Sequence, residues 1–275
     1  MYQTAADSES SARTPEYNGE MRDEKESADA APRRATADFG FAEVDAESKS
    51  ALVGGVFSRV APYYDRMNDF MSGGMHRLWK NIAVSRGDLR PGMRVLDLAC
   101  GGGDIAARVL PRIVPGGRIT LADANAEMLA AARRRIRHPA ARFALCDGES
   151  LPFAEHSFDR VFIAFGLRNI TRRERALCEM RRVLRPGGMC VVLEFTPPEG
   201  MFSALRRRYL ISVLPRIGEC CFGDAESYRY LGESILRFPP RDALSEMMRA
   251  AGFARVECAD VAAGIVAAHR ARRLS

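Results

Sequence analysis

The sequence predicts an α/β fold in which helices cover both faces of a doubly wound, mostly parallel β-sheet. From about residue 90, short apolar runs alternate with amphipathic stretches at helical spacing. The runs are continuously apolar, as in strands that are buried on both faces. At 275 residues and 47% hydrophobic, the chain is long enough for one domain of roughly 200 to 250 residues and a tail.

Five apolar runs are the predicted parallel strands. They are MRVLDLA (93–99), RITLAD (118–123), RFALC (142–146), FDRVFIAF (158–165) and MCVVLEF (189–195). Helical patterns lie at 104–112, 125–137 and 172–184, and the last one stops at RPGG. The repeated order of strand, helix and strand predicts a parallel sheet. The segment 254–271 predicts a closing pair of strands, one of them antiparallel, which brings the sheet to seven.

Composition divides the chain into a tail and one domain. Residues 1–35 hold eight acidic and five basic residues with few large apolar ones, which predicts a disordered acidic tail. Residues 36–275 are then a single domain. Its predicted parts are cover helices in 45–86, the sheet core in 90–200, a lid or membrane-facing insertion in 201–238 and C-terminal strands in 254–271.

The charge and the cysteine pattern narrow the class of protein. The whole chain has a net charge of +6 and the tail a net charge of −3, so the remaining domain carries +9. Such a basic domain suits binding to nucleic acid or to anionic lipid. The alternative is that an Arg- and Ala-rich composition reflects a GC-rich genome. No signal peptide and no run of 18 apolar residues is present, so we expect a cytoplasmic protein, with peripheral attachment at the inner face of the plasma membrane left open. Without a C-x-x-C pair or H-E-x-x-H, no metal site is expected.

A glycine loop follows the first strand, where ligands of doubly wound sheets bind. In LDLACGGGD, Gly101, Gly103 and the later Ala106 fit the dinucleotide fingerprint G-x-G-x-x-A. Asp123, at the end of the second strand, can accept ribose hydroxyls of a dinucleotide or of an adenosyl group. These residues alone do not decide the cofactor.

Two further carboxylates favour S-adenosylmethionine. Asp97 would repel a pyrophosphate but suits an ammonium and a sulfonium, and Asp147 can accept from an adenine amino group. Helix capping explains each acid well singly and remains the less favoured alternative for all three together at successive strand ends. A P-loop is excluded because no G-K-[ST] follows the glycines, while an NAD oxidoreductase stays a weaker alternative.

Several blocks of the chain together resemble one family. They are VFSRVAPYYDRMNDFMSGGMHRLWK, VLDLACGGGD, ADANAEML, DGESLPF, FGLRNIT, RVLRPGGMCVVLEF, GDAESYRYLGESILRFPP and AGIVAAHR. From about residue 38 to its end, the chain is similar to the ubiquinone/menaquinone biosynthesis C-methyltransferases. The resemblance implies a Rossmann-like class I methyltransferase fold and C-methylation of a polyprenylated benzoquinol or of demethylmenaquinol, with S-adenosylmethionine as donor.

The resemblance also implies which residues contact the cofactor. Carried over by position, they are Gly102, Asp123, Asp147, Gly148 and Ala164. Gly102 stands where the family commonly has Thr, and Ala164 where it often has Ser, so contacts through those hydroxyls are absent. Cys100 replaces a common Gly. With the residues of the glycine loop, the predicted cofactor-binding set is Gly101, Gly102, Gly103, Asp97, Asp123, Asp147, Gly148 and Ala164.

Methylating a quinol carbon requires charge on a neighbouring ring oxygen, because a phenolate pushes electron density onto its ortho carbon. Arg168 and Asn169 leave the fourth strand beside the expected methyl position and are predicted to hold a phenolate and an ordered water. A guanidinium keeps its proton, so Arg168 is expected to stabilise charge rather than act as base.

The segment that precedes the sheet supplies the remaining catalytic candidates. Tyr64 offers a phenol, and Asp65 or Asp69 with a raised pKa is a candidate base. His76 is expected to pack or cap beside Trp79. The alternative for YYDRMND is a helix cap with two surface acids.

A polyprenyl tail implies a membrane surface or a quinone-biosynthesis complex as partner. Residues 201–222 are amphipathic around Arg206, Arg207 and Arg208, which suits a membrane surface or a tail-binding lid, with an ordinary packed helix as the alternative. No nucleic-acid partner is expected, because the turn after the fourth strand is FGLRN and not N/D-P-P-Y/F. Another small or lipid substrate, a non-catalytic cofactor binder and a homo-oligomer remain open.

Overall fold

The computed structural model describes residues 35–274. The predicted acidic tail, residues 1–35, therefore lies outside the described residues except for Ala35. Residues 35–274 belong to one compact unit, which contains all the helices and strands described below.

The central feature is a seven-stranded sheet with the order β5-β4-β3-β6-β7-β9-β8. Its strands are β3 (Arg94–Leu98), β4 (Arg118–Asp123), β5 (Ala141–Leu145), β6 (Phe158–Ala164), β7 (Leu184–Phe195), β8 (Ala254–Asp260) and β9 (Val266–Arg272). The first five pair in parallel, and β9 runs antiparallel to both β7 and β8. The predicted mostly parallel sheet with an antiparallel C-terminal strand is confirmed.

The register of the inner strands brings their carboxyl ends to one edge. Asp97 of β3 lies between Leu121 of β4 and Phe162 of β6. From β3 the chain continues to β4 and β5 on one side of the sheet. It then crosses to β6, on the other side of β3, and continues to β7, so the strand order reverses between β3 and β6. This edge is the topological switch point, where open α/β sheets bind ligands.

Helices form a separate hydrophobic core on each face of the sheet. On one face, α3 (Met75–Ser85), α4 (Asp104–Ile113) and α5 (Ala126–Arg135) bury Ala83, Val109 and Leu129 against the strands. On the other, α6 (Arg173–Val183) and α10 (Arg241–Ala250) bury Leu177 and Met248. The hydrophobic spacing of these helices places one apolar side of each on the sheet.

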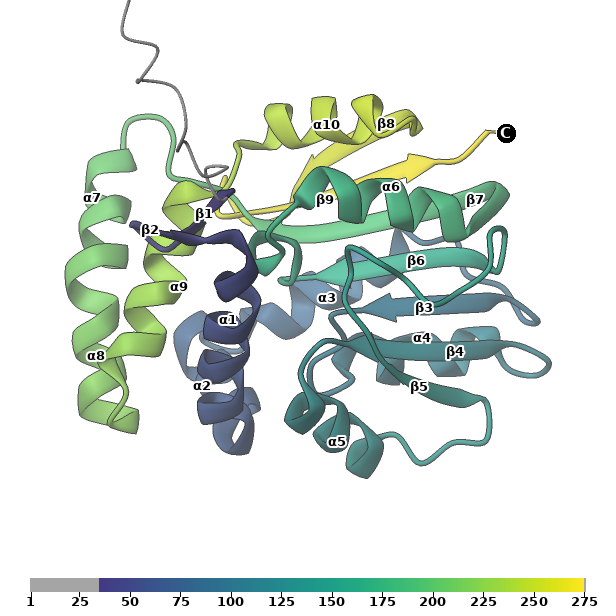
Figure 1. Ribbon diagram of the computed structural model, residues 1–275, viewed down its shortest axis with the longest axis horizontal. Helices are drawn as coiled ribbons and strands as arrows, with labels where there is room; N and C mark the ends of the chain where they lie inside the picture. Colours follow the sequence, from purple (N-terminus) through teal and green to yellow (C-terminus); the bar gives the residue numbers. More distant parts are fainter. Residues whose placement is uncertain (1–34, 275) are drawn as a thin grey trace, which may run out of the picture. The chain divides into compact units, whose positions relative to one another are not determined.

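A second group of helices gathers at the carboxyl ends of the strands (Figure 1). It comprises α1 (Ala46–Val60), η1 (Ala61–Tyr63), α2 (Tyr64–Ser72), α7 (Ser203–Arg208), η3 (Tyr209–Val213), α8 (Leu214–Phe222) and α9 (Ala225–Arg237). Val60 and Met67 from the first segments pack with Leu214, Tyr228 and Leu231 from the later ones. Segments more than 130 residues apart in the chain thus form one helical cover over the strand ends.

The structure adds elements that the sequence pattern did not predict. Strands β1 (Thr36–Phe39) and β2 (Ala42–Asp45) form a separate hairpin, and a 3-10 turn, η2 (Leu167–Asn169), follows β6. Strand β7 begins at Leu184, before RPGG, because it pairs there with Phe158 through a register shift. Among residues 35–274, no helix is long and apolar enough to cross a membrane.

Candidate active site

The glycine loop between β3 and α4 is held by the acid at the end of β4. Gly101 has a φ of +51°, a left-handed conformation that favours glycine. Its backbone N–H donates to Asp123 Oδ2 at 2.8 Å. The other oxygen, Asp123 Oδ1, accepts from the backbone of Asn125 at 2.9 Å. Burial raises the pKa of Asp123, although these backbone hydrogen bonds act in the opposite direction.

The ends of β3, β4, β5 and β6 surround a hollow that we name the strand-end pocket. It contains five of the predicted cofactor residues: Gly101, Asp123, Asp147, Gly148 and Ala164. Asp147 Oδ1 accepts from the backbone of Glu149 at 2.9 Å. A Cβ at Gly148 would lie 2.9 Å from Ile170 Cδ1, so a larger residue here would require the end of the Ile170 side chain to shift. These residues fit the adenosyl part of S-adenosylmethionine. Asp123 can accept from the ribose hydroxyls and Asp147 from the adenine amino group, with Gly101 and Gly148 beside them.

The other predicted cofactor residues lie elsewhere. Gly102 and Asp97 line a narrow opening beside the glycine loop, which we name the loop cleft, together with Lys80. A Cβ at Gly102 would make only ordinary contacts, at 3.7 Å or more, so the loop does not require glycine there. Gly103 lines neither hollow. A Cβ on it would come within 3.0 Å of Ile136, so its role here is close packing of the loop beside α5.

Asp97 is a buried acid with an altered titration. It is 1% exposed, and its Oδ2 accepts from the backbone of Ala106 at 3.1 Å. Burial raises the pKa of Asp97 to about 8. A bound cation would favour the ionised form of this carboxyl.

The largest of the three hollows, the helical cavity, lies between the helical cover and the sheet and has a volume of about 460 Å³. Its walls are mostly apolar and include Met67, Trp79, Phe195, Leu214 and Ile265. Tyr64 lines this cavity, the strand-end pocket and the loop cleft. Tyr64 therefore stands at the junction of all three.

Arg168 enters the helical cavity as half of a buried ion pair. Its Nη1 lies 3.0 Å from Glu194 Oε1 and also donates to the carbonyl of Phe165. The guanidinium carbon lies 5.6 Å from the centre of the Phe195 ring. Its Nε is buried and has no hydrogen-bond partner within the described residues. Glu194 therefore fixes the orientation of the Arg168 guanidinium through Nη1 and leaves the Nε–H donor without a partner.

Asn169 lines the strand-end pocket and reaches the cavity through a tyrosine. Its Oδ1 accepts from the hydroxyl of Tyr230 at 3.0 Å, and Tyr230 on α9 lines the helical cavity. Burial raises the pKa of Tyr230 to about 12. The sequence had not singled out this tyrosine.

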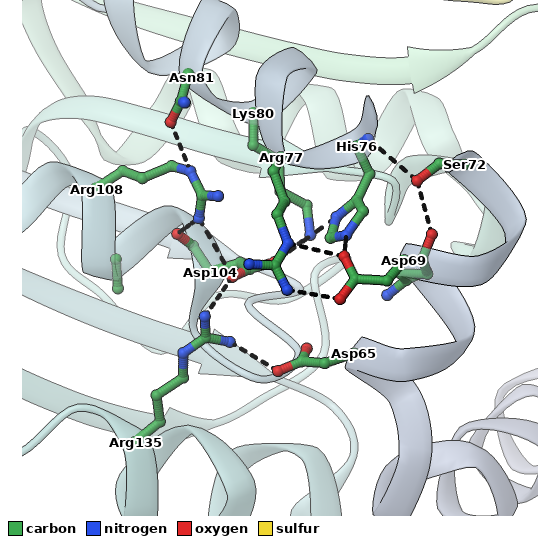
Figure 2. A network of polar contacts seen from close by, with 12 residues as sticks. Asp65, Asp69, Ser72, His76, Arg77, Lys80, Asn81, Asp104, Arg108 and Arg135 are labelled. Carbon is green, nitrogen blue, oxygen red and sulfur yellow. Dashed lines mark hydrogen bonds and ion pairs between the residues drawn. The ribbon is translucent and has the colours of Figure 1, made fainter. Parts of the chain in front are cut away.

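The expected base on α2 is not supported at Asp69. Figure 2 shows Asp69 held between His76 and Arg77, with hydrogen bonds of 2.8 Å to His76 Nε2 and 2.6 and 2.7 Å to Arg77. These bonds hold the pKa of Asp69 well below its usual range, so the expectation of a raised pKa was wrong. Asp69 lines none of the three hollows.

Asp65 and His76 have other surroundings. Asp65 lines the loop cleft, but it is about half exposed and binds Arg135 at 3.1 Å. His76 and Trp79 both line the helical cavity, and burial lowers the pKa of His76. Its Nδ1 has no hydrogen-bond partner in the described part of the chain and lies 3.9 Å from Asp104 Oδ2.

Sequence reasoning missed Lys80, Glu194 as partner of Arg168, and Tyr230. Lys80 is the last residue of the block VFSRVAPYYDRMNDFMSGGMHRLWK, and Glu194 is the penultimate residue of a predicted strand, so position marked both without assigning a role. Within residues 35–274, no group of three or more His, Cys, Asp or Glu side chains is arranged to hold a metal ion.

Residues 45–273 match the ubiE/COQ5 methyltransferase family. The chain is 47% identical over 238 residues to the ubiquinone/menaquinone biosynthesis C-methyltransferase UbiE of Ralstonia nicotianae, which covers 86% of this chain and 98% of that protein. It is 44% identical over 255 residues to the protein of the same name from Pseudomonas fluorescens, covering 91% and 98%.

Solved structures with lower sequence identity share the fold. A SAM-dependent methyltransferase from Aquifex aeolicus superposes with a TM-score of 0.55 at 16% identity, over 76% of this chain and 97% of that one. Phosphoethanolamine N-methyltransferase 2 of Haemonchus contortus, solved with S-adenosyl-L-methionine, gives 0.55 at 17% identity, over 71% and 52%. The predicted Rossmann-like class I methyltransferase fold is confirmed.

Proposed function

Because the chain belongs to the ubiE/COQ5 methyltransferase family, we propose that it transfers a methyl group to a ring carbon of a polyprenylated quinol. Family membership confirms the predicted class of enzyme and its donor, S-adenosylmethionine. The proposed acceptors are a polyprenylated methoxybenzoquinol in ubiquinone biosynthesis and demethylmenaquinol in menaquinone biosynthesis, the pathways named in the relatives.

The observation that carries the proposal is the helical cavity and its junction with the strand-end pocket. An apolar space of about 460 Å³ suits a quinol ring and the first isoprene units, which are themselves apolar. Tyr64, Arg168 and Tyr230 are among its polar lining groups, and Tyr64 also lines the strand-end pocket. A ring bound there would meet the donor's methyl group beside Tyr64.

The reaction forms a carbon–carbon bond and breaks a carbon–sulfur bond. S-adenosylmethionine supplies an electrophilic methyl on a sulfonium, and its sulfur leaves with the bonding electron pair. The ring carbon then loses its proton, to water in the simplest case, and regains aromaticity. The protein's task is to hold the ring in line with the methyl and to stabilise charge on the ring oxygen.

We assign charge stabilisation to Arg168, whose buried Nε has no acceptor within residues 35–274 and is free to donate to a ring oxygen. Tyr64 would position the ring oxygen at the junction, and Asn169 would hold Tyr230 in place. Asp69 has no part in the chemistry, since its carboxylate is already bound by Arg77 and His76. Asp65, at the loop cleft, is assigned to holding Arg135.

The tail of the substrate requires access from an apolar phase. At the start of α7, Met201, Phe202 and Leu205 are 88%, 63% and 67% exposed. Tyr209 and Ile265, which line the cavity, are also exposed, so the cavity wall includes exposed apolar side chains. We infer that this face touches the membrane and admits the prenyl tail.

The basic residues beside this face divide into two roles. Arg206 donates from Nη2 to the carbonyl of Gly264 at 2.7 Å and lines the cavity. Arg207 and Arg208 are exposed and form no ion pair within residues 35–274, so they are free to meet anionic lipid.

Vesicle flotation with anionic lipid tests the membrane face. Replacing Met201, Phe202 and Leu205 together by serine should lower the bound fraction about tenfold, whereas Leu145→Ser, exposed on the sheet edge, should not change it. Equal binding of both variants would place membrane contact elsewhere.

Methyl transfer to purified short-chain quinols tests the function itself. The protein should methylate demethylmenaquinol, or the methoxybenzoquinol, kept reduced under anaerobic conditions, and mass spectrometry should detect the product. The oxidised quinones should give none, because they carry no ring hydroxyl to ionise. Binding of the donor without methylation of either quinol would overturn the proposed acceptor class.

A further inference from the structure

The loop cleft contains an ammonium group to which neither the sequence nor the family resemblance assigns a role. Lys80 on α3 is 5% exposed and lines both this cleft and the helical cavity. A lysine is rarely buried so deeply unless its charge is paired. The partners of this ammonium therefore indicate what it does.

Within the described residues, the Nζ of Lys80 has one hydrogen bond, to Asp104 Oδ2 at 2.6 Å. An ammonium has three N–H donors, so two are left over. No other acceptor within residues 35–274 takes them. The side chain therefore presents unused donors to the hollows that it lines.

Asp104 does not need Lys80 for its own neutralisation. Its other oxygen lies 2.6 Å from Arg135 Nη2 and 3.2 Å from Arg108 Nη1 (Figure 2). Counting Asp65, which binds Arg135, three cations face two carboxylates. These five side chains carry one positive charge in excess, with the buried Asp97 of the same cleft not counted.

The position of this charge matches one end of the methyl donor. The strand-end pocket holds Asp123 and Asp147, which fit the ribose and adenine, so the amino-acid end extends the other way. Gly101 and Ala164 line both the strand-end pocket and the loop cleft, which connects the two along that direction. The amino-acid end carries a carboxylate, and the cleft offers it Lys80.

We propose that Lys80 binds the α-carboxylate of S-adenosylmethionine through the two donors that Asp104 leaves free. Asp104, steadied by Arg108 and Arg135, holds the ammonium in place. The buried Asp97, which lines the same cleft, then suits the α-ammonium, so that the cleft recognises a zwitterion. The proposal rests on the donor alone and is independent of which quinol accepts the methyl.

The test compares two ligands and four proteins by calorimetry, with no acceptor present. The ligands are S-adenosylhomocysteine and its decarboxylated analogue, which keeps the amine but lacks the carboxylate. The wild-type protein should prefer S-adenosylhomocysteine about 10- to 100-fold, as expected for a charged hydrogen bond in a buried site. Lys80→Met should lose most of that preference by weakening S-adenosylhomocysteine, while the analogue's affinity changes about twofold or less.

Two further variants separate carboxylate binding from the general loss of a cation on α3. Arg77→Met removes a cation of the same helix that pairs with Asp69 and lines none of the hollows, so it should keep the preference between the ligands. Lys80→Arg should restore part of it. Should the methionine variant fail to fold, Lys80→Gln provides the same comparison. Equal weakening of both ligands by the lysine variants, or no weakening, would overturn the proposal.

Failure of donor recognition is distinguishable from failure of the proposed function. Loss of the ligand preference concerns only donor recognition. A protein that binds the donor through Lys80 but methylates no quinol would leave this inference intact and remove the acceptor assignment.

Discussion

The strand-end pocket and the helical cavity meet at Tyr64 but are built in different ways. The pocket is formed mainly by residues that follow successive strands, so most lie within a few residues of a strand end. The cavity is formed by helices from two segments far apart in the chain, packed over those ends. The first depends mainly on a regular sheet, with α1 and Tyr64 closing one side, whereas the second depends on how separate helices pack together. Donor binding and acceptor binding should therefore respond to different substitutions.

The largest effect is expected from Arg168 on the acceptor side. Arg168→Met should lower kcat/KM by about 100- to 1,000-fold, as expected for losing a group that stabilises developing charge. It also leaves Glu194, 1% exposed, without its ion-pair partner, which should cost about 3–5 kcal/mol of stability. Steady-state kinetics and chemical denaturation measure the two effects.

A double variant separates these consequences. Arg168→Met with Glu194→Gln removes the stranded charge, so stability should recover while activity stays low. Affinity for S-adenosylhomocysteine should change about threefold or less, since neither residue lines the strand-end pocket. Recovery of activity with stability would show that Arg168 acts on the fold and not on the quinol.

On the donor side, Asp123→Ala should weaken S-adenosylhomocysteine about 100-fold. The change removes acceptors for the ribose hydroxyls and frees the N–H of Gly101. Calorimetry checks the affinity. Asp147→Ala should weaken the affinity for S-adenosylhomocysteine about tenfold, because it removes only the hydrogen bond from the adenine amino group. Equal affinity in the Asp123 variant would break the division between the two regions.

Asp97 should make the stability of the free protein fall as pH rises. Its pKa in the folded state, about 8, exceeds that of an unfolded aspartate, so ionisation favours unfolding between the two values. The contribution is fully present below about pH 4 and is lost by about pH 8. Asp97→Asn should flatten that decline, by a few kcal/mol across the interval, in denaturation curves at several pH values.

Asp69 should show the smallest effect and the opposite pH dependence. Its pKa is depressed by Arg77 and His76, so its contribution to stability is present above about pH 4 and is lost as pH falls further. Asp69→Asn should cost about 0.5–1 kcal/mol at neutral pH, as a partly exposed ion pair does, and change turnover about threefold or less. Abolished turnover in a folded variant would restore Asp69 as the base.

The same division governs how much could be predicted from the sequence. Asp123, Asp147 and Gly148 were placed correctly in one pocket, because parallel strands end at one edge and their exits can be found from apolar runs. The direction of the pKa shift of Asp69 was mispredicted because its partner Arg77 lies on the next helix, and periodicity does not say how two helices meet. Tyr230 went unnoticed for the same reason: it reaches Asn169 across 61 positions of the chain.

Lys80 shows what sequence pattern leaves undecided even within a known block. Its position in HRLWK was visible, but its burial beside Asp104 depends on α3 packing against α4. A lysine on a helix is usually solvated, so nothing in the pattern distinguishes this one. Only the packed structure shows that the buried Lys80 ammonium uses one N–H donor on Asp104 and leaves two without a partner in the described residues.

The most direct measurement is the position of the transferred methyl group. With trideuteromethyl S-adenosylmethionine and a short-chain quinol, tandem mass spectrometry or NMR can locate the label in the product. Ring binding in the helical cavity, with the oxygen held by Arg168 and the carbon facing the donor at Tyr64, predicts the label on a ring carbon. A label on a ring oxygen, or none on either quinol, would contradict it.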